Sequence, residues 1–341
     1  MKILLTGSDG YIGTQMSQVL MNRGHEVIGL DAGFYREGWL YNDVATLPQV
    51  ITKDTRDITE EDLKGFDAVI SLADLSNDPL GQTNPENTYA INHTGIMELA
   101  RKAKKVGIKR FVYSSSCSIY GIATESFVNE ESVVNPQTAY AKCKYLVEQD
   151  LSKMADESFS PTFMRNATVY GPSPRMRFDL VVNNLSGLAY TENEIKMTSD
   201  GTPWRPLVHV LDVCEAFAAV IEAPIEIIHN QIFNVGNNNG NYTIKQVAEI
   251  VAGVFTGCTT SFGNSDGDTR SYRVSFDKIT NTLPGFKSTR SVKDGAEDLK
   301  KVFESIKMTK EMFSFRAFTR LKALNYLSET KQIDDKFFWI K

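Results

Sequence analysis

The stretch KILLTGSDGYIG, residues 2–13, decides the fold. Its apolar start, KILLT, is followed at once by Gly7, Gly10 and Gly13, and then by a helical pattern that Gly24 ends. The sequence therefore predicts a strand, a tight glycine turn and a helix. Glycine suits such a turn because the backbone bends sharply there and because another group must approach it closely.

An acidic residue supports a nucleotide-binding interpretation of this turn. Asp31 ends the second apolar run, HEVIGLD, 18 residues after Gly13. The start of a helix offers unpaired N–H groups to a pyrophosphate, and an acid at that distance accepts hydrogen bonds from the adenosine ribose. Because the acid also repels a 2′-phosphate, the pattern predicts NAD rather than NADP. Asp57, after the next expected strand, either contacts the adenine or is a surface acid.

Short apolar runs alternate with helical patterns through the first half of the chain. Further strands are expected at 66–73, 109–116 and 161–167, and further helices at 87–106 and 138–156. Strands that alternate with helices of this length form a parallel sheet with both faces covered. The predicted fold class is therefore α/β, with a Rossmann-type doubly wound parallel sheet and a smaller mixed α/β domain for the substrate.

The alternation becomes less regular after Gly171, which suggests where the two domains divide. Residues 1–171 are expected to form the NAD-binding domain, to which residues 205–235 return. Residues 172–204 and 236–341 are expected to form the substrate domain. The sequence has no internal repeat and no linker long enough to separate independent units.

Composition excludes several classes of function. The chain has 341 residues, 42% of them hydrophobic and 23% charged, with a net charge of −5. These values are ordinary for a soluble globular protein and argue against nucleic acid or an anionic membrane as partner. The four cysteines form no CxxC pair and the chain has only four histidines, so no metal site is expected. With no signal peptide visible, the expected location is the cytoplasm.

Tyr140 and Lys144, in YAKCK, are four residues apart and therefore lie on one face of the expected helix. An ammonium group near a phenol lowers the phenol pKa, which gives a base able to accept a proton from a sugar hydroxyl. Taken alone, such a pair is more often an ordinary surface pair. Here it follows a dinucleotide turn and comes 24 residues after Ser116, in YSSSCSIYG.

With these three elements the chain resembles the extended short-chain dehydrogenases/reductases of the nucleotide-sugar epimerase and dehydratase family, and in plan the UDP-glucose/UDP-galactose 4-epimerases. The resemblance implies that Tyr140 is the acid and base, that Lys144 holds the nicotinamide ribose, and that Ser116 binds the reacting hydroxyl. The cofactor-binding set that it implies is Gly7, Gly10, Tyr11, Ile12, Gly13, Asp31, Ala73, Tyr140 and Lys144. Members of the family usually form homodimers, so a homodimer is expected.

The resemblance also suggests how a nucleotide-diphosphate sugar is bound. Asn184 is expected to donate to its pyrophosphate, and Arg205 either forms a charged fork with it or is a surface salt-bridge residue. Arg270 is preferred to Arg273 as a further phosphate or sugar ligand, while His209 is expected to pack in the interior. Three departures from the family leave the sugar open: Thr168 in place of asparagine, an aromatic loop at 32–43, and the segment 75–81.

Four functions remain open at this point. The first is NAD-dependent epimerisation at carbon 4 through a transient 4-keto sugar, with Tyr140 as acid and base. The second is dehydration, for which Cys117 would replace the Asp-Glu pair that family dehydratases carry where this chain has Cys117 and Ser118. A keto-sugar reductase is disfavoured by the preference for NAD, and an inactive binding protein by the retained serine, tyrosine and lysine. Cys117 is therefore either a small packing residue or a weak acid.

Overall fold

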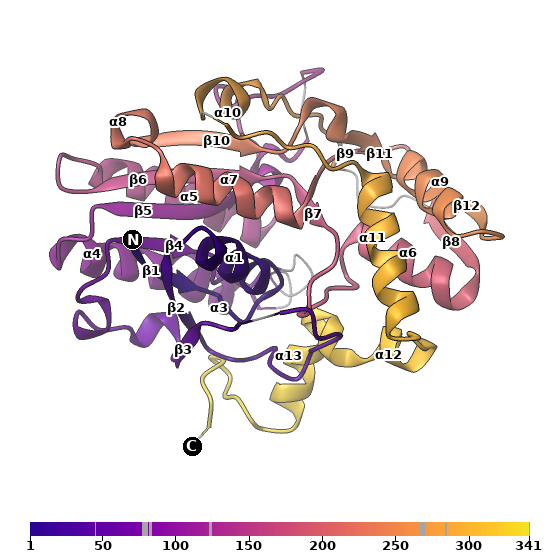
Figure 1. Ribbon diagram of the computed structural model, residues 1–341, viewed down its shortest axis with the longest axis horizontal. Coiled ribbons are helices and arrows are strands. Elements are labelled where there is room, and N and C mark those ends of the chain that lie inside the picture. Colours follow the sequence, from indigo (N-terminus) through magenta and orange to yellow (C-terminus); the bar gives the residue numbers. More distant parts are fainter. Residues whose placement is uncertain are drawn as a thin grey trace.

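A large parallel sheet organises the protein. Its structure is a computed structural model, which describes residues 1–44, 46–76, 81, 84–122, 125–265, 270–283 and 285–340. Within this part of the chain, seven parallel strands lie in the order β10-β6-β5-β4-β1-β2-β3 (Figure 1). Their bounds are β1 Lys2–Thr6, β2 Glu26–Asp31, β3 Gln49–Thr52, β4 Ala68–Ser71, β5 Arg110–Ser116, β6 Ser160–Asn166 and β10 Gln231–Val235. The predicted Rossmann-type α/β class is confirmed.

Alternate residues of each strand pack against helices on opposite faces of the sheet. From β1, Ile3 and Leu5 join one apolar core with residues of α1 (Tyr11–Asn22) and α7 (Val210–Glu222). Leu4 joins another, with residues of α4 (Ile96–Lys105) and α5 (Ala139–Met154). Because successive side chains of a strand point in opposite directions, strands buried on both faces need apolar runs like KILL.

The helical stretch expected at 87–106 is interrupted. It consists of α3 (Pro85–Tyr89), a π-helical turn (Ala90–Gly95) and α4. In that turn Asn92 is fully buried, and its amide both accepts from Leu75 N (2.8 Å) and donates to Leu75 O (3.1 Å). The helix thereby holds the backbone of the segment that follows β4. The helices expected at 11–23 and 138–156 agree with α1 and α5 to within two residues.

Two smaller sheets stand beside the large one (Figure 1). One has the order β11-β9-β7 (Asn241–Thr243, Trp204–His209 and Thr168–Tyr170), and the other pairs β12 (Thr259–Ser265) with β8 (Glu194–Ser199). Of the segment 205–235, β10 joins the large sheet and α7 packs on α1, whereas β9 lies in the small sheet. The helices of this second region are α6 Val181–Glu192, α9 Ile244–Val254, α11 Val292–Ser305 and α12 Lys310–Ser314, whereas α10 Asp277–Thr282 packs on β10 of the large sheet.

The end of the chain returns to the large sheet. After α13 (Arg320–Glu329) the tail runs back toward the side of β2 and β3 (Figure 1). There Trp339 Nε1 donates to Ala32 O at 2.6 Å, and the Arg56 guanidinium lies 3.7 Å from the Phe338 ring centroid. The last segment of the substrate domain expected at 172–204 and 236–341 therefore contacts the segments that follow β2 and β3.

Among the described helices, none combines the length and the apolar character needed to cross a membrane.

Candidate active site

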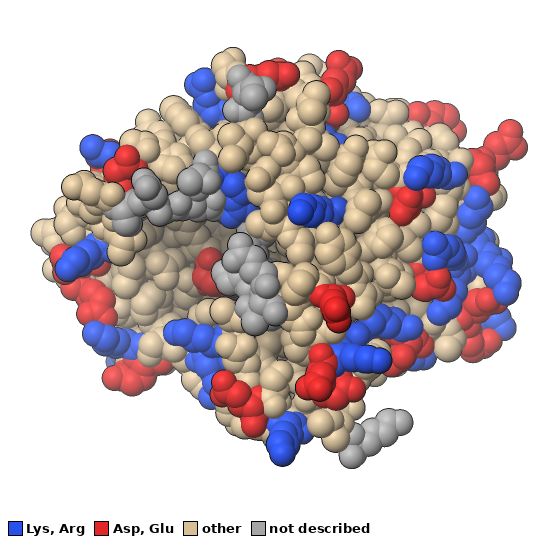
Figure 2. Space-filling model, turned by 180° about the vertical axis from the view of Figure 1, so that it is seen from behind, with Lys and Arg blue, Asp and Glu red and all other residues tan. Residues whose placement is uncertain are grey.

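A cavity of about 930 Å³ opens at the carboxyl ends of the parallel strands. It is lined by the turns after β1, β2, β4, β5 and β6 and, from the second region, by residues that include Arg205, Arg270 and Tyr272. Figure 2 shows a hollow near the middle of the face opposite to that of Figure 1. Open parallel sheets bind their ligands at this edge, and the volume suits a dinucleotide together with a second ligand.

The glycine turn forms one wall of the cavity in close contact with its neighbours. Gly7 has φ +74°, and a Cβ there would lie 2.9 Å from Ala73 N. A Cβ on Gly13 would lie 2.1 Å from Gly7 O, so neither position accepts a side chain. Gly10 begins α1, and no side chain caps its first turn. This backbone cradle at a helix N-terminus fits a pyrophosphate.

The carboxylate of Asp31 lies at the end of β2, in the same cavity wall. It accepts hydrogen bonds from Gly33 N at 2.7 Å and from Asp9 N at 3.1 Å. Burial raises the pKa of Asp31, whereas the two backbone donors act in the opposite direction. Together with the glycine cradle, this acid gives the cavity the elements that an NAD adenosine and pyrophosphate require.

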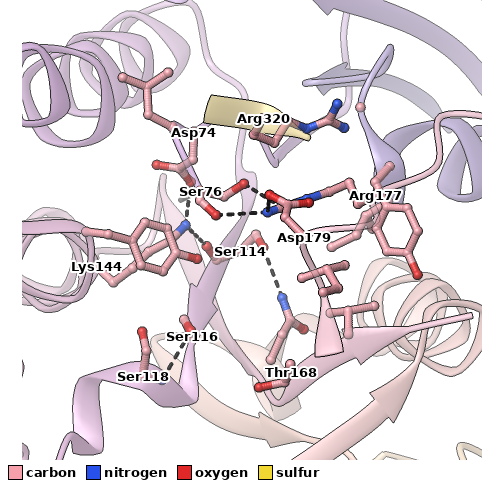
Figure 3. A pocket seen from close by; sticks show the side chains of 18 of the residues that line it. Asp74, Ser76, Ser114, Ser116, Ser118, Lys144, Thr168, Arg177, Asp179 and Arg320 are labelled. Atoms are coloured by element: carbon pink, nitrogen blue, oxygen red, sulfur yellow. Dashed lines mark hydrogen bonds and ion pairs between the residues drawn. The ribbon is translucent and has the colours of Figure 1, made fainter. Parts of the chain in front are cut away.

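Helix α5 presents Tyr140 and Lys144 to the cavity. The Lys144 ammonium lies 5.4 Å from the centroid of the Tyr140 ring, forms an ion pair with Asp74 and donates to Ser114 O (Figure 3). Burial lowers the pKa of Lys144, but the charges of Asp74 and of the Tyr140 phenolate outweigh that effect and raise it. Lys144 is therefore a fixed cation beside the phenol, which is the condition for a tyrosine base.

Asp74 is a residue of the candidate site that the sequence did not reveal. Its carboxylate is 3% exposed, and burial raises its pKa to about 6 even though Lys144 opposes the shift. Oδ2 is bound to Lys144, while Oδ1 has no hydrogen-bond partner among the described residues. Its neighbour Ala73 was expected to contact the cofactor, and both residues line the cavity.

Ser116 and Cys117 end β5 side by side but face different surroundings. Ser116 lines the cavity, where its Oγ accepts from Ser118 N at 3.1 Å. Cys117 does not line the cavity; it is 1% exposed in the core beneath α7, and its thiol donates to Arg165 O at 3.1 Å. Burial raises the pKa of Cys117 well above its ordinary value. A thiol in these surroundings stays protonated.

The residues expected to bind substrate are only partly brought together. Arg205 and Arg270 line the cavity, and Arg205 donates to the backbone oxygens of Trp204 and Arg270. Asn184 lies outside the lining and donates to Phe178 O at 2.9 Å.

Two further residues named from the sequence also lie outside the cavity lining. Asp57 ends a short turn whose earlier residues, Asp54 and Thr55, do line the cavity. His209 is fully buried against the ring of Tyr170, as expected for a packing residue, and burial lowers its pKa to about 4.

A second group of charged residues was missed because it comes from distant segments. Arg177 donates to the carboxylate of Asp179 at 2.9 Å and to Ser76 Oγ at 2.9 Å (Figure 3). Arg320, from α13, lines the same cavity. The segment PRMRFD gave a signal for the first pair through its density of charge, whereas nothing in the sequence around Arg320 connects it with Arg177 or Asp179, more than 140 residues earlier.

Comparisons with known proteins agree with this geometry. The chain is 26% identical over 273 residues to the UDP-glucose 4-epimerase of Bacillus subtilis, a match covering 72% of this chain and 80% of that protein. Among solved structures, an NAD-dependent NDP-hexosamine 5,6-dehydratase involved in tunicamycin biosynthesis superposes with a TM-score of 0.79, at 22% identity, over 89% of this chain and 98% of its own.

The UDP-glucose 4-epimerase of Thermotoga maritima, solved with UDP-glucose, superposes with a TM-score of 0.77 at 24% identity, over 90% of this chain and 100% of its own. At these identities the structural likeness concerns the fold. Residues 3–236, which hold the glycine turn, the β5 serines and helix α5, match the sequence profile described as "NAD dependent epimerase/dehydratase family". The protein belongs to that family and has NAD as its cofactor.

Proposed function

We propose that the protein epimerises carbon 4 of a nucleotide-diphosphate sugar through a transient 4-keto sugar. The observation that carries the proposal is the position of Tyr140 and Lys144 in one cavity with the glycine cradle and Asp31. A sugar that lies between α5 and the cofactor would have its hydroxyl at the phenol and its carbon at the nicotinamide. NAD bound in that place would supply the hydride chemistry, by taking a hydride from carbon 4 and returning it to that carbon.

Three side chains of this chain carry the proton chemistry in the proposal. Tyr140 removes the proton of the 4-hydroxyl and later gives it back to the 4-oxygen. Lys144 stabilises the phenolate and holds the nicotinamide ribose, with Asp74 fixing the ammonium on one side. Ser116, at the end of β5, donates to the reacting oxygen and keeps it within reach of the phenol.

The remaining residues named from the sequence have defined places in the proposal. The backbone of Tyr11 and Ile12 and the turn at Ala73 border the cofactor. Arg205 and Arg270 pair with the diphosphate of the sugar nucleotide by charged hydrogen bonds. Asn184 binds the diphosphate only if its side-chain amide gives up the hydrogen bond that it donates to Phe178 O.

The position of Asp57 gives it a smaller part. Since Asp54 and Thr55 of the same turn line the cavity and Asp57 does not, these two are the better candidates for contact with the adenine.

The dehydratase alternative is less well supported. Elimination of water needs an acid and a base beside the sugar, and the turn after β5 (Cys117–Tyr120) carries no carboxylate. Cys117 would have to replace it, but its thiol points into the core and its pKa is raised by burial. Epimerisation needs no group beyond those already described.

Relatives suggest the substrate and assembly with which to begin. Because the curated relative is named a UDP-glucose 4-epimerase, UDP-sugars are the first substrates to test. A homodimer is part of the proposal, as closed two-fold dimers are the commonest oligomers. Light scattering after gel filtration measures the mass of the protein in solution and so tests for the dimer.

The decisive experiment follows the products of purified protein by NMR with UDP-, dTDP-, GDP- and CDP-sugars. Inversion at carbon 4 without net consumption of NAD supports the proposal. Loss of water identifies a dehydratase, and stoichiometric oxidation of NADH identifies a reductase; either result overturns it. The Tyr140→Phe variant is expected to lose turnover by about 10²- to 10⁴-fold while still binding the sugar nucleotide.

A further inference from the structure

Arg320, the first residue of α13, is a buried cation that lines the cavity and forms no ion pair with any described residue. Its side chain is 4% exposed and lies 3.9 Å from the centroid of the Tyr35 ring. Within the part of the chain that the structure describes, it forms no hydrogen bond or ion pair. Because an unpaired charge is costly to bury, a cation in this position indicates an anionic ligand.

The surroundings of Arg320 carry an excess of positive charge. Arg177 lies on the same side of the cavity and already engages the nearby carboxylate of Asp179 (Figure 3). Burial, and next the charge of Arg177, lower the pKa of Arg320 to about 10, while the charges of Tyr35, Asp179 and Asp31 act in the opposite direction. The two guanidinium groups therefore share one close carboxylate, which leaves positive charge available to a ligand.

The two arginines lie along the expected path of the cofactor. At the nucleotide end, the guanidinium of Arg320 lies over the ring of Tyr35, which comes four residues after Asp31. At the reaction end, Arg177 donates to Ser76, two residues after the Asp74 that pairs with Lys144. Asn183 links it to the phosphate turn by donating to both Arg177 O and the Tyr11 hydroxyl. Between the ribose that Asp31 would bind and the ribose beside Tyr140 lies the pyrophosphate of a dinucleotide.

We propose that Arg320, next to Arg177, binds the pyrophosphate of NAD together with the glycine turn that lines the same cavity. The proposal rests on the proposed function, because it requires the dinucleotide to lie along the cavity as described. It gives the C-terminal segment a direct part in binding the cofactor, beyond the residues 3–236 that match the family profile.

The C-terminal segment holds Arg320 in place by contacts with the nucleotide-binding region. Leu324 and Leu327 of α13 pack with Leu75 and Ile91, which follow β4 and line the cavity. Further along, Asn87 Nδ2 donates to Asp335 O at 2.7 Å. Since these contacts do not involve the guanidinium, a change at Arg320 can remove the charge while α13 stays packed.

The test measures dissociation constants by calorimetry for full-length protein freed of bound nucleotide. The ligands are NAD, ADP, UDP and adenosine, and the variants are Arg320→Gln and Arg320→Lys. Lys322→Gln, which removes an exposed charge from the same helix, is the matched control. Arg320→Gln should weaken NAD and ADP by about 10- to 100-fold and leave adenosine unchanged. Arg320→Lys should retain part of that affinity, and Lys322→Gln all of it.

Other results would overturn the proposal in recognisable ways. Equal weakening of adenosine and ADP would mean that Arg320 only supports the loop of Tyr35. Weakening of UDP without ADP would assign the cation to the sugar nucleotide instead. Unchanged ADP affinity in Arg320→Gln, with NAD still bound by the wild type, would refute the inference alone, whereas a wild type that binds no NAD would refute the proposed function as well. Should Arg320→Gln melt early, the Arg320→Lys comparison with ADP decides.

Discussion

Helix α5 carries two buried ion pairs one turn apart, Lys144 with Asp74 and Glu148 with Arg165. All four side chains are at most 4% exposed. In the second pair, Glu148 accepts from Arg165 Nε and Nη2 and from Ser115 Oγ, and Arg165 also donates to the Tyr120 hydroxyl. Its hydrogen-bonding capacity is used within the protein.

The first pair, Lys144 with Asp74, differs because the described residues do not use all of its hydrogen-bonding capacity. Asp74 Oδ1 has no partner among the described residues, and both members line the cavity, whereas neither Glu148 nor Arg165 does. A saturated buried pair fixes one structure, while an unsaturated pair at a cavity wall is prepared to meet a ligand. We therefore expect the Glu148 pair to hold α5 on the sheet and the Lys144 pair to act in catalysis.

The largest effect should follow loss of the cation at the site. Lys144→Met removes the charge that stabilises the phenolate of Tyr140, so turnover should fall by about 10²- to 10⁴-fold. Some thermal stability should be lost as well, because Asp74 is left buried without its cationic partner. Turnover by NMR and melting by calorimetry test this, with the exposed Lys142→Met on the same helix as control. Near-normal turnover would remove Lys144 from the mechanism.

Breaking the core pair should instead affect stability. Arg165→Met leaves the Glu148 carboxylate buried without its partner, which should lower the free energy of unfolding by about 3–5 kcal/mol. The matched control is Arg23→Met, because Arg23 pairs with Glu215 and Glu222 where the side chains are 37–38% exposed. That change should cost less than about 1 kcal/mol. Similar urea midpoints for the two variants would contradict the structural role of the core pair.

The pH dependence of turnover sharpens the difference between the pairs. Because the pKa of Asp74 is raised to about 6, the carboxylate is present above pH 6 and is protonated below it, which releases Lys144. Wild-type turnover should therefore fall about tenfold per unit as the pH drops below 6. Asp74→Asn should have a lower turnover that no longer depends on this ionisation. An acidic limb unchanged in the variant would assign it to another group.

The smallest effect is expected at Cys117. Its thiol donates to Arg165 O, on the core side of β5, so Cys117→Ala should leave turnover unchanged within about twofold and lower stability by about 1 kcal/mol. Turnover and urea unfolding of the same preparation measure both. A turnover loss as large as that of Lys144→Met would restore the dehydratase hypothesis.

The fold could be predicted because its signals are local. A strand, a glycine turn and a helix follow one another within residues 2–22, and the alternation of short apolar runs with helical patterns continues to β6. The π-helical turn at Ala90–Gly95 and the bond from its Asn92 to the backbone of Leu75 could not be predicted, because that contact joins residues 17 positions apart in the chain.

By itself, then, the sequence determined the parallel sheet, the cradle of Gly7, Gly10 and Gly13, and the Tyr140–Lys144 face of α5. These features follow from backbone geometry and from periodicity over a few residues. The tertiary structure alone decided that Ser116 faces the cavity while its neighbour Cys117 faces the core.

Tertiary structure alone also brought Asp74 to Lys144 and Arg320 to Arg177. Those pairs are 70 and 143 residues apart in the chain, and only the packing of whole elements makes them neighbours. The charge of a side chain follows from its residue type, but the partner that gives the charge its function depends on the fold.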